Sequence, residues 1–400
     1  MIRLLLSFAI AFLAGTVSLA AQQPAEDGAI RIATFNASLN RGEEGQLASD
    51  LADPAATQPA RVAEIIQRVN PDVVLINEFD YDEDGAAARL FVDNFLSRSQ
   101  NGAEPWVPAA IFSAPSNTGI PTGIDLDRDS SPVGPGDAFG FGFFPGQYGM
   151  LILSKLPIAR DDARTFQEFL WRDMPNARLP DDPGTSAPAD YYTAETLEKF
   201  RLSSKSHWDV PVEAGDTVIH LLASHPTPPV FDGPEDRNGT RNADEVRFWI
   251  DYVGGADYIY DDAGETGGLP ADASFVILGD LNLDPNDGDG MRDVGAALLA
   301  AERVQDPMPA SEGGAEDAAA DGGVNGGHTG DPRYDTADFF DGMGGAGNMR
   351  VDYVLPSADL TVTGSGIFWP TADDPLAELL GPEDAQTSDH RLVWVDIAIE

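Results

Sequence analysis

One short segment of this sequence combines an apolar run, which could form a buried strand, with polar residues directly after it. Residues 275–278 are all apolar, and Asp280 and Asn282 follow them closely. Four consecutive apolar residues are typical of a strand buried on both faces, and layered α/β folds build their sites where such strands end. A glycine and an aspartate after a strand are equally common in plain turns, so the segment needs partners elsewhere in the chain.

Polar residues of similar chemical type stand at the ends or edges of other apolar segments. They are Asn36, Glu78, His225, Asp352, Asp389 and His390. Carboxylates and carboxamides are hard oxygen ligands for Mg²⁺, Mn²⁺ or Ca²⁺, and a chain without cysteine has no thiolate zinc site. Two histidines beside carboxylates suit phosphate contact and proton transfer. Together these groups are the parts of metal-assisted phosphoryl transfer, although Asn36 and Asp352, taken singly, fit a turn and a loop cap as well.

The segments that must position these residues alternate between strand and helix patterns. Apolar runs predict strands at 30–35, 73–76, 150–153, 217–223, 275–278, 349–355 and 392–397, and helical spacing predicts helices at 59–69 and 241–253. Segments rich in glycine, proline and aspartate predict loop insertions near 80–149, 161–194 and 307–347, the last of them mobile. Because no internal repeat or obvious linker is present, residues 30–400 are expected to form one α/β domain after a tail at 21–29.

The first 20 residues have the pattern of a secretory signal peptide. Arg3 precedes an apolar run, and the small residues around Ala20 match a signal-peptidase site. A membrane-anchoring first helix is the alternative, but the run is shorter than the about 20 residues that a span requires. We therefore expect a secreted or periplasmic chain that keeps no membrane anchor after cleavage and, without cysteine, forms no disulfide.

The charge of the chain is extreme, with 67 acidic against 24 basic residues and a formal net charge of −43. So negative a surface repels polyanions and lacks the basic footprint of non-specific nucleic-acid binding. This argues against a processive DNA-binding protein, whereas a nuclease whose divalent metal bridges the repulsion remains an alternative. Solubility in a salty environment explains most of the charge.

Six short motifs occur in a characteristic order. They are Thr34-Phe35-Asn36, Asn77-Glu78, Ser224-His225-Pro226, Gly279-Asp280-Leu281-Asn282, Val351-Asp352-Tyr353 and Ser388-Asp389-His390. This set resembles the endonuclease/exonuclease/phosphatase (DNase I-like) superfamily, and its exported bacterial branch more than its DNA repair enzymes. The similarity extends from Arg31 to Ile397. It implies a four-layer αββα sandwich, in which two mixed β-sheets pack face to face between outer helices.

The resemblance also implies roles for the residues of the motifs. Glu78 would be the principal metal ligand, with Asn36 beside it and Asp389 completing the shell. Asp280 and Asn282 would place and polarise the attacking water. The metal would be Mg²⁺, with Mn²⁺ or Ca²⁺ as alternatives.

The two histidines of the motifs would act on the phosphate. His390, oriented by Asp352, would either take the water's proton or hydrogen-bond a phosphoryl oxygen, and His225 would donate to the phosphate. Arg237 and Arg241 are candidates for a bidentate contact with a substrate phosphate, and surface ion pairs are the alternative for both.

The remaining histidines carry weaker signals. His207 and His220 are expected to be structural, and His328, in a glycine-rich segment, has no assigned role. A separate acidic segment with Asp125, Asp127 and Asp129 resembles the start of a calcium-binding loop. Two departures weaken this resemblance, because a serine stands at the sixth position in place of glycine and no glutamate falls at the twelfth. A solvated acidic loop is therefore the alternative.

The expected function is an exported, divalent-metal-dependent phosphoesterase that hydrolyses a phosphate ester by in-line attack of water, without a covalent intermediate. A small phosphoester is favoured over duplex DNA, because the basic residues that grip a duplex are not evident in the sequence. A secreted DNase I-like nuclease is the same-fold alternative. A catalytically silent binding module is least favoured, since no residue of the motifs is missing. We expect a monomer.

Overall fold

The computed structural model describes residues 28–382 and 385–399. The predicted signal peptide at 1–20 and most of the expected tail at 21–29 lie outside these residues, so both stay predictions. Among the residues that the structure describes, no helix is both long and apolar enough to cross a membrane.

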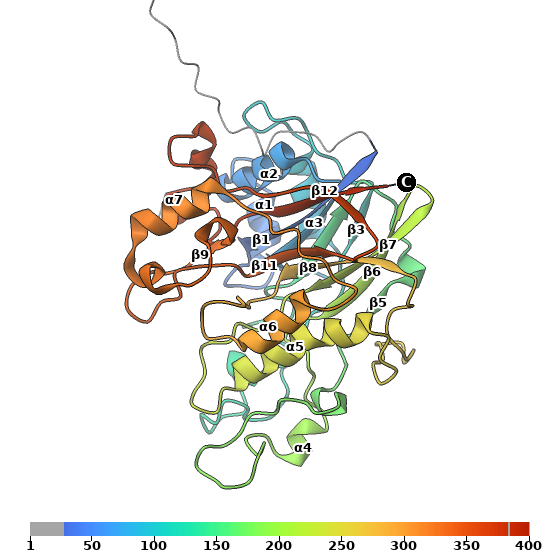
Figure 1. The fold of residues 1–400 in the computed structure, drawn as a ribbon, viewed down its shortest axis with the longest axis vertical. Coiled ribbons are helices and arrows are strands. Elements are labelled where there is room, and N and C mark those ends of the chain that lie inside the picture. The colour runs from blue at the N-terminus through green and yellow to red at the C-terminus, as the bar shows by residue number, and fades with distance from the viewer. Residues whose placement is uncertain (1–27, 383–384, 400) are drawn as a thin grey trace, which may run out of the picture.

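Two mixed β-sheets form the centre of the molecule (Figure 1). The strands of the six-stranded sheet, in spatial order, are β12 (Thr361–Ile367), β13 (Val393–Ala398), β1 (Ala29–Leu39), β2 (Val73–Phe79), β4 (Met150–Ser154) and β3 (Ala110–Phe112). In this sheet β1 and β2 are parallel, and the other neighbours are antiparallel.

The five-stranded sheet has the order β11 (Asp352–Pro356), β8 (Ser274–Asp280), β7 (Thr217–Ser224), β6 (His207–Ala214) and β5 (Arg164–Thr165). Only β7 and β8 are parallel within it. A parallel pair in each sheet needs a crossover connection, and these two crossovers supply some of the outer helices.

The helices cover the outer faces of the two sheets. The helices against the six-stranded sheet are α1 (Gln46–Leu51), α2 (Thr57–Val69) and α3 (Ala86–Phe91), and those against the five-stranded sheet are α5 (Arg237–Val253) and α6 (Arg292–Leu299). Val62 of α2 lies in one outer apolar cluster with Phe35 of β1, and Trp249 of α5 lies in another with Phe275 of β8. Figure 1 shows α2 on one side of the sheets and α5 and α6 on the other.

A third apolar cluster fills the layer between the two sheets. It contains Ile32 and Leu75 from the six-stranded sheet and Leu221 and Leu278 from the five-stranded sheet, all buried. Strands whose side chains alternate between two buried faces must be apolar throughout, which explains the continuous apolar runs of the sequence. The arrangement confirms the expected sandwich of two mixed sheets between helices.

The segment expected as a mobile loop at 307–347 is more ordered than its composition suggests, and that prediction is corrected. It contains helix α7 (Glu312–Asp321) and a two-stranded sheet of β9 (Ala337–Asp338) and β10 (Asn348–Met349). The side chain of Ser311 caps α7 by accepting a hydrogen bond from the backbone N–H of Gly314. A Cβ at Gly313 would lie 2.1 Å from the carbonyl oxygen of Trp369, so α7 packs through its glycines rather than through large apolar residues.

The other insertions are mostly irregular. Besides α3, β3 and β5, they contain a π-turn (Val92–Leu96) and short 3-10 turns, and the single-turn helix α4 (Ala194–Leu197) begins where the second insertion ends. Further 3-10 turns occur later in the chain at Gly323–Gly327, Pro332–Tyr334 and Pro375–Leu380. The 3-10 turns in the insertions are Pro135–Asp137, Arg160–Asp162 and Trp171–Asp173.

Candidate active site

Polar residues replace apolar ones at one end of the layer between the sheets. Along β8, Leu278 belongs to the inner cluster, and Asp280 comes two residues later on the same face. Along β2, Asn77 follows Leu75 in the same way. Asp352 of β11 pairs with Asp280 across the strands. The two-residue period thus gathers polar side chains from both sheets at one place.

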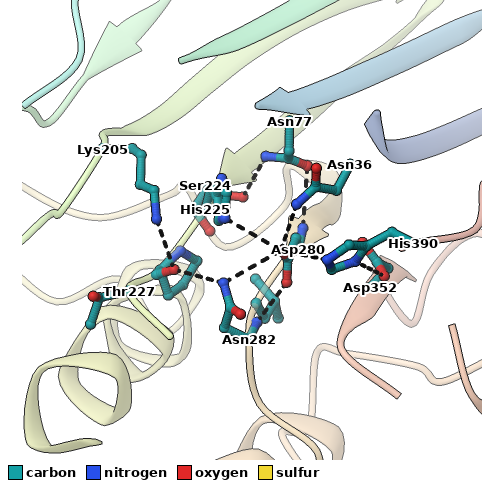
Figure 2. A network of polar contacts seen from close by, with 12 residues as sticks. Asn36, Asn77, Lys205, Ser224, His225, Thr227, Asp280, Asn282, Asp352 and His390 are labelled. Atoms are coloured by element: carbon teal, nitrogen blue, oxygen red, sulfur yellow. Dashed lines mark hydrogen bonds and ion pairs between the residues drawn. The ribbon is translucent and has the colours of Figure 1, made fainter. Parts of the chain in front are cut away.

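The Asp280 carboxylate is the centre of this polar cluster (Figure 2). The side-chain amides of Asn36 and Asn282 donate to Oδ2 at 3.0 and 3.4 Å, and the backbone N–H of Asn282 donates to Oδ1 at 2.9 Å. His225 Nε2 lies 3.3 Å from the same Oδ2. Burial opposes ionisation of Asp280, but the charge of His390 and the bond from His225 outweigh it and hold the pKa of Asp280 well below its usual range.

His390 lies between two buried carboxylates. Its Nδ1 is 2.8 Å from Asp352 Oδ2, and its Nε2 is 3.7 Å from Asp280 Oδ2. Burial alone would lower the pKa of His390, but Asp352 and Asp280 raise it well above its usual value. The Phe339 ring and the imidazole pack in a T-shaped arrangement, with ring centroids 5.4 Å apart. His390 is therefore a fixed, protonated donor at neutral pH.

The protonation state of His225 is opposite to that of His390. Burial and then the nearby Lys205 ammonium lower the pKa of His225 to about 4. Its ring is buried, and its Nδ1 has no hydrogen-bond partner among the described residues. At neutral pH the site therefore holds one neutral and one protonated histidine.

Glu78 lies beside Asn36, which hydrogen-bonds its carboxylate, and close to Asp389. Burial and then the charge of Asp389 raise the pKa of Glu78 to about 7. The Ser38 hydroxyl donates to Asp389 Oδ1 at 3.2 Å. Glu78 has a φ of 58°, in the left-handed region that a non-glycine residue adopts only when its surroundings impose it. Such strain at a partly buried carboxylate is typical of a functional position.

The donor set fits a hard divalent cation. Glu78 and Asp389 are two carboxylates whose mutual repulsion a cation would relieve, and Asn36 adds a carboxamide beside them. In the same cluster, one side-chain atom each of Asp280, Asp352 and His390 lies within 4.8 Å of the others, and the protonated His390 has no lone pair free for a metal. Asp352 Oδ1 is buried, and no described residue hydrogen-bonds it. The structure thus places Asn36 and Asn282 against Asp280, and Asn36 and Asp389 beside Glu78, while their roles in binding metal and water stay predictions.

Asn77 and Lys205, for which the sequence predicts no role, also belong to this cluster. Asn77 joins the sheets, because its Oδ1 accepts from the backbone N–H of Asp280 and its Nδ2 donates to the carbonyl oxygen of Ser224. Lys205 is buried with its Nζ 3.4 Å from the carbonyl oxygen of Pro226, and burial lowers the pKa of its ammonium. The in-phase position of Asn77 on β2 was a usable signal, whereas Lys205 lies outside any apolar run.

Helix α5 holds the loops that carry the cluster. Glu245 accepts hydrogen bonds from the backbone N–H groups of Ser204 at 2.5 Å and Thr227 at 2.7 Å. Asn242 donates to the carbonyl oxygens of Thr227 at 2.8 Å and Leu281 at 3.0 Å. One face of α5 therefore connects the segment before Lys205, the loop after His225 and the loop after Asp280.

Replacing Glu245 with glutamine is expected to lower the free energy of unfolding by about 1–3 kcal/mol. One carboxylate oxygen becomes an NH₂ group that faces the backbone N–H of Ser204 or Thr227, and that buried donor then has no acceptor. Urea unfolding measures the change, with Glu213→Gln on the exposed side of β6 as the control. Equal stability of the two variants would contradict a positioning role for Glu245.

The phosphate contact expected for Arg241 is not supported, and this prediction is corrected. Arg241 is buried, and its guanidinium donates to the backbone carbonyl oxygens of Leu202 at 2.8 Å and Phe139 at 2.6 Å. Through these bonds the Arg241 guanidinium stabilises the loops that pack beside α5. Arg237 forms an ion pair with Glu235, the alternative considered from the sequence, so its phosphate contact stays a prediction.

His207 and His220 lie away from Asp280, as expected of structural residues. His207 Nε2 is 2.9 Å from the carbonyl oxygen of Glu245, and its Nδ1 is 2.6 Å from Ser203 Oγ. A carbonyl only accepts, so Nε2 carries the proton and the neutral ring accepts from Ser203. His220 Nδ1 is 2.7 Å from Asp209 Oδ1.

Replacing His207 with glutamine is expected to reduce stability less at pH 5 than at pH 7. Burial lowers the pKa of His207 to about 4, so between pH 6.5 and 4 the unfolded chain takes up a proton that the folded chain refuses. Wild type therefore loses about 2 kcal/mol between pH 7 and pH 5 through this residue, and the variant does not. Urea unfolding of both proteins at pH 5 and pH 7 measures the difference between their free energies of unfolding. This difference should be smaller at pH 5, and an equal difference at the two pH values would contradict the prediction.

The family model described as "Endonuclease/Exonuclease/phosphatase family" matches residues 33–390. None of the curated proteins matches the chain. Solved structures similar to it include an endonuclease/exonuclease/phosphatase from Beutenbergia cavernae, with 16% identity, a TM-score of 0.49 and coverage of 93% of this chain and 72% of that one.

Two further structures show similar values. The family protein from Leptotrichia buccalis has 13% identity and a TM-score of 0.47, with 92% of this chain and 100% of that chain covered. The human Nocturnin catalytic domain has 13% identity and a TM-score of 0.45, with 93% and 95% covered. The family match includes each of the six motifs, from Thr34 to His390, and the chain therefore belongs to the endonuclease/exonuclease/phosphatase family.

Proposed function

We propose that this protein is an exported, divalent-metal-dependent phosphoesterase that hydrolyses a phosphate ester by direct attack of water. One observation carries the proposal. The ionised Asp280 carboxylate is held by Asn36 and Asn282 and faces both histidines, His225 at 3.3 Å and His390 at 3.7 Å. A negatively charged acceptor beside a protonated donor is what activates water and stabilises a phosphoryl group.

The residues divide the reaction between them. Asp280 and Asn282 would hold the water, with the Asp280 carboxylate accepting its proton. His390, protonated and fixed by Asp352, would donate a hydrogen bond to a phosphoryl oxygen, which favours this role over that of the base. Neutral His225 has a single N–H, at Nε2 facing Asp280 Oδ2, and would share this donor with the phosphate. A divalent cation bound by Glu78, Asn36 and Asp389 would supply charge neutralisation of the phosphate.

A small phosphoester is the proposed substrate class. The formal net charge of −43 disfavours long polyanions. Arg241, one of the two arginines considered for phosphate, is occupied by backbone carbonyls. Loops around the site determine which phosphoester is bound and whether a monoester or a diester is cleaved, and such loops differ among proteins of one fold.

A panel of chromogenic phosphate monoesters and diesters, measured with and without metal, tests the proposal. We expect hydrolysis that EDTA abolishes and that Mg²⁺ or Mn²⁺ restores. Nicking of plasmid DNA at low salt without hydrolysis of small esters would establish the nuclease alternative instead. Equal inactivity of wild type and His390→Ala on all substrates and metals would overturn the enzymatic proposal and leave the silent binding module.

Export is a separate part of the proposal. Residues 1–20 have the charge and apolar pattern of a cleaved signal peptide. Amino-terminal sequencing of the protein after expression in a bacterial host with a secretion system is expected to show cleavage near Ala20. An intact amino terminus in the cytoplasmic fraction would contradict export.

A further inference from the structure

The acidic loop at Asp125, Asp127 and Asp129 is distant in sequence from the motifs and has no part in the proposed reaction. Each of these residues offers a carboxylate oxygen within 4.8 Å of the other two. The nearest basic residue in sequence, Arg128, pairs with Asp182 at 2.6 Å instead. Among the described ion pairs, none joins a lysine or arginine to the three aspartates.

A fourth carboxylate, Asp137, faces the same loop. Asp137 is only 2% exposed, and its Oδ2 has no hydrogen-bond partner among the described residues. Its Oδ1 accepts from the backbone N–H of Leu126, at 2.8 Å, the residue between Asp125 and Asp127. From the other side, the Asp127 carboxylate lies against Gly136, where a Cβ would be 2.2 Å from Asp127 Oδ2. The Asp127 and Asp137 side chains thus point toward one another's backbone.

Each of the four carboxylates uses one oxygen and leaves the other. Backbone N–H groups donate to Asp125 Oδ2 at 3.1 Å, to Asp127 Oδ1 at 3.1 Å, to Asp129 Oδ1 at 2.7 Å and to Asp137 Oδ1 at 2.8 Å. Asp125 Oδ1, like Asp137 Oδ2, is buried without a hydrogen bond from any described residue. Buried carboxylate oxygens without a proton donor are costly unless a cation takes the place of the donor.

We propose that Asp125, Asp127, Asp129 and Asp137 form a structural Ca²⁺ site. Ca²⁺ accepts six to eight oxygen ligands in flexible geometry, which suits four carboxylates on an irregular loop better than the strict octahedron of Mg²⁺. The structure accounts for the two departures from a calcium-binding loop, the serine at the sixth position and the missing glutamate at the twelfth. Ser130 adopts the left-handed conformation, with a φ of 78°, that glycine supplies at the sixth position, and Asp137 takes the place of the missing acidic ligand one residue later.

Bound Ca²⁺ would fasten this loop to the neighbouring insertion. Leu126 belongs to the outer apolar cluster with Phe169 and Trp171. Arg128 hydrogen-bonds the carbonyl oxygen of Tyr191 as well as Asp182. The cation would therefore stabilise the contact between the loop and the segment that leads to α4, without touching the Asp280 cluster.

Calcium binding by the purified full chain tests the proposal. Ca²⁺ is titrated calorimetrically in excess Mg²⁺, so that the Asp280 cluster does not contribute, for wild type, Asp129→Asn and Asp137→Asn. We expect wild type to bind one more Ca²⁺ per chain than either variant, and Ca²⁺ to raise the Tm of wild type alone. Asp161→Asn, at an exposed aspartate outside the loop, should match wild type.

Two results would overturn the site. One is equal Ca²⁺ stoichiometry in wild type and Asp129→Asn, and the other is an equal Tm rise with Ca²⁺ in both. Asp129 is exposed, so this variant is expected to fold even if the buried Asp137→Asn does not. Hydrolysis of phosphoesters is not part of this readout, so the calcium site and the proposed activity can fail separately.

Discussion

Asp280→Asn is expected to lower kcat on the best phosphoester by about 10³-fold while the fold is retained. The substitution keeps the shape of the side chain but removes its charge and one acceptor oxygen. Asn36 and Asn282 then face an amide, and His390 loses one of the two carboxylates that keep it protonated. The measurement is steady-state kinetics at saturating Mg²⁺ together with near-UV circular dichroism.

The matched control lies on the loop that follows β8. Asp289 is exposed a short distance after β8, and Asp289→Asn should leave kcat within about twofold of wild type, as ordinary surface substitutions do. A small effect of Asp280→Asn, comparable to that of the control, would show that the carboxylate neither holds nor activates the water.

Glu78→Gln is expected to raise the Mg²⁺ concentration for half-maximal activity by about 100-fold. The reason is the loss of the carboxylate that, with Asp389, forms the proposed metal site. In wild type, burial and then Asp389 raise the pKa of Glu78 to about 7, so protons compete with the metal below pH 7. Apparent Mg²⁺ affinity should therefore fall as the pH falls from 7 to 5, by up to about tenfold per pH unit.

The glutamine variant should lose that pH dependence along with its affinity. Activity measured against Mg²⁺ concentration at pH 5, 6 and 7 for both proteins separates the two effects. Glu83→Gln, at an exposed glutamate shortly after β2, serves as the control and should behave like wild type. Metal affinity in Glu78→Gln that matched wild type at every pH would place the cation elsewhere.

The strands that support the site were largely predictable because their signal is local. A run of apolar residues marks β2, β4, β7 and β8, and each prediction agrees with the structure to within a few residues. β6 and β12 were not predicted, because proline or glycine and polar residues interrupt them. Helix α7 was missed for a similar reason, since it packs through Gly313 and Gly314 where large apolar residues normally signal a buried face.

The candidate site was likewise predictable from the sequence only in part. The types of its residues and their places at strand ends were readable, as Asp280 and His390 show. The role of Arg241 was not, because a guanidinium that binds backbone carbonyls has the same sequence signal as one that binds phosphate. The face of α5 that carries Asn242 and Glu245 was also missed, since polar residues on a helix usually indicate exposure to solvent.

The sequence by itself determined the fold class, the order of the motifs and the kind of atoms available for chemistry, since these are properties of neighbouring residues. Only the tertiary structure decided how those atoms are charged and joined. His225 follows a buried strand and His390 precedes one, so the sequence gives the two histidines similar signals. In the structure, Asp352 and Asp280 raise the pKa of His390, whereas burial and Lys205 lower the pKa of His225. Electrostatic interaction depends on distance in space, and folding brings these groups together from strands of both sheets.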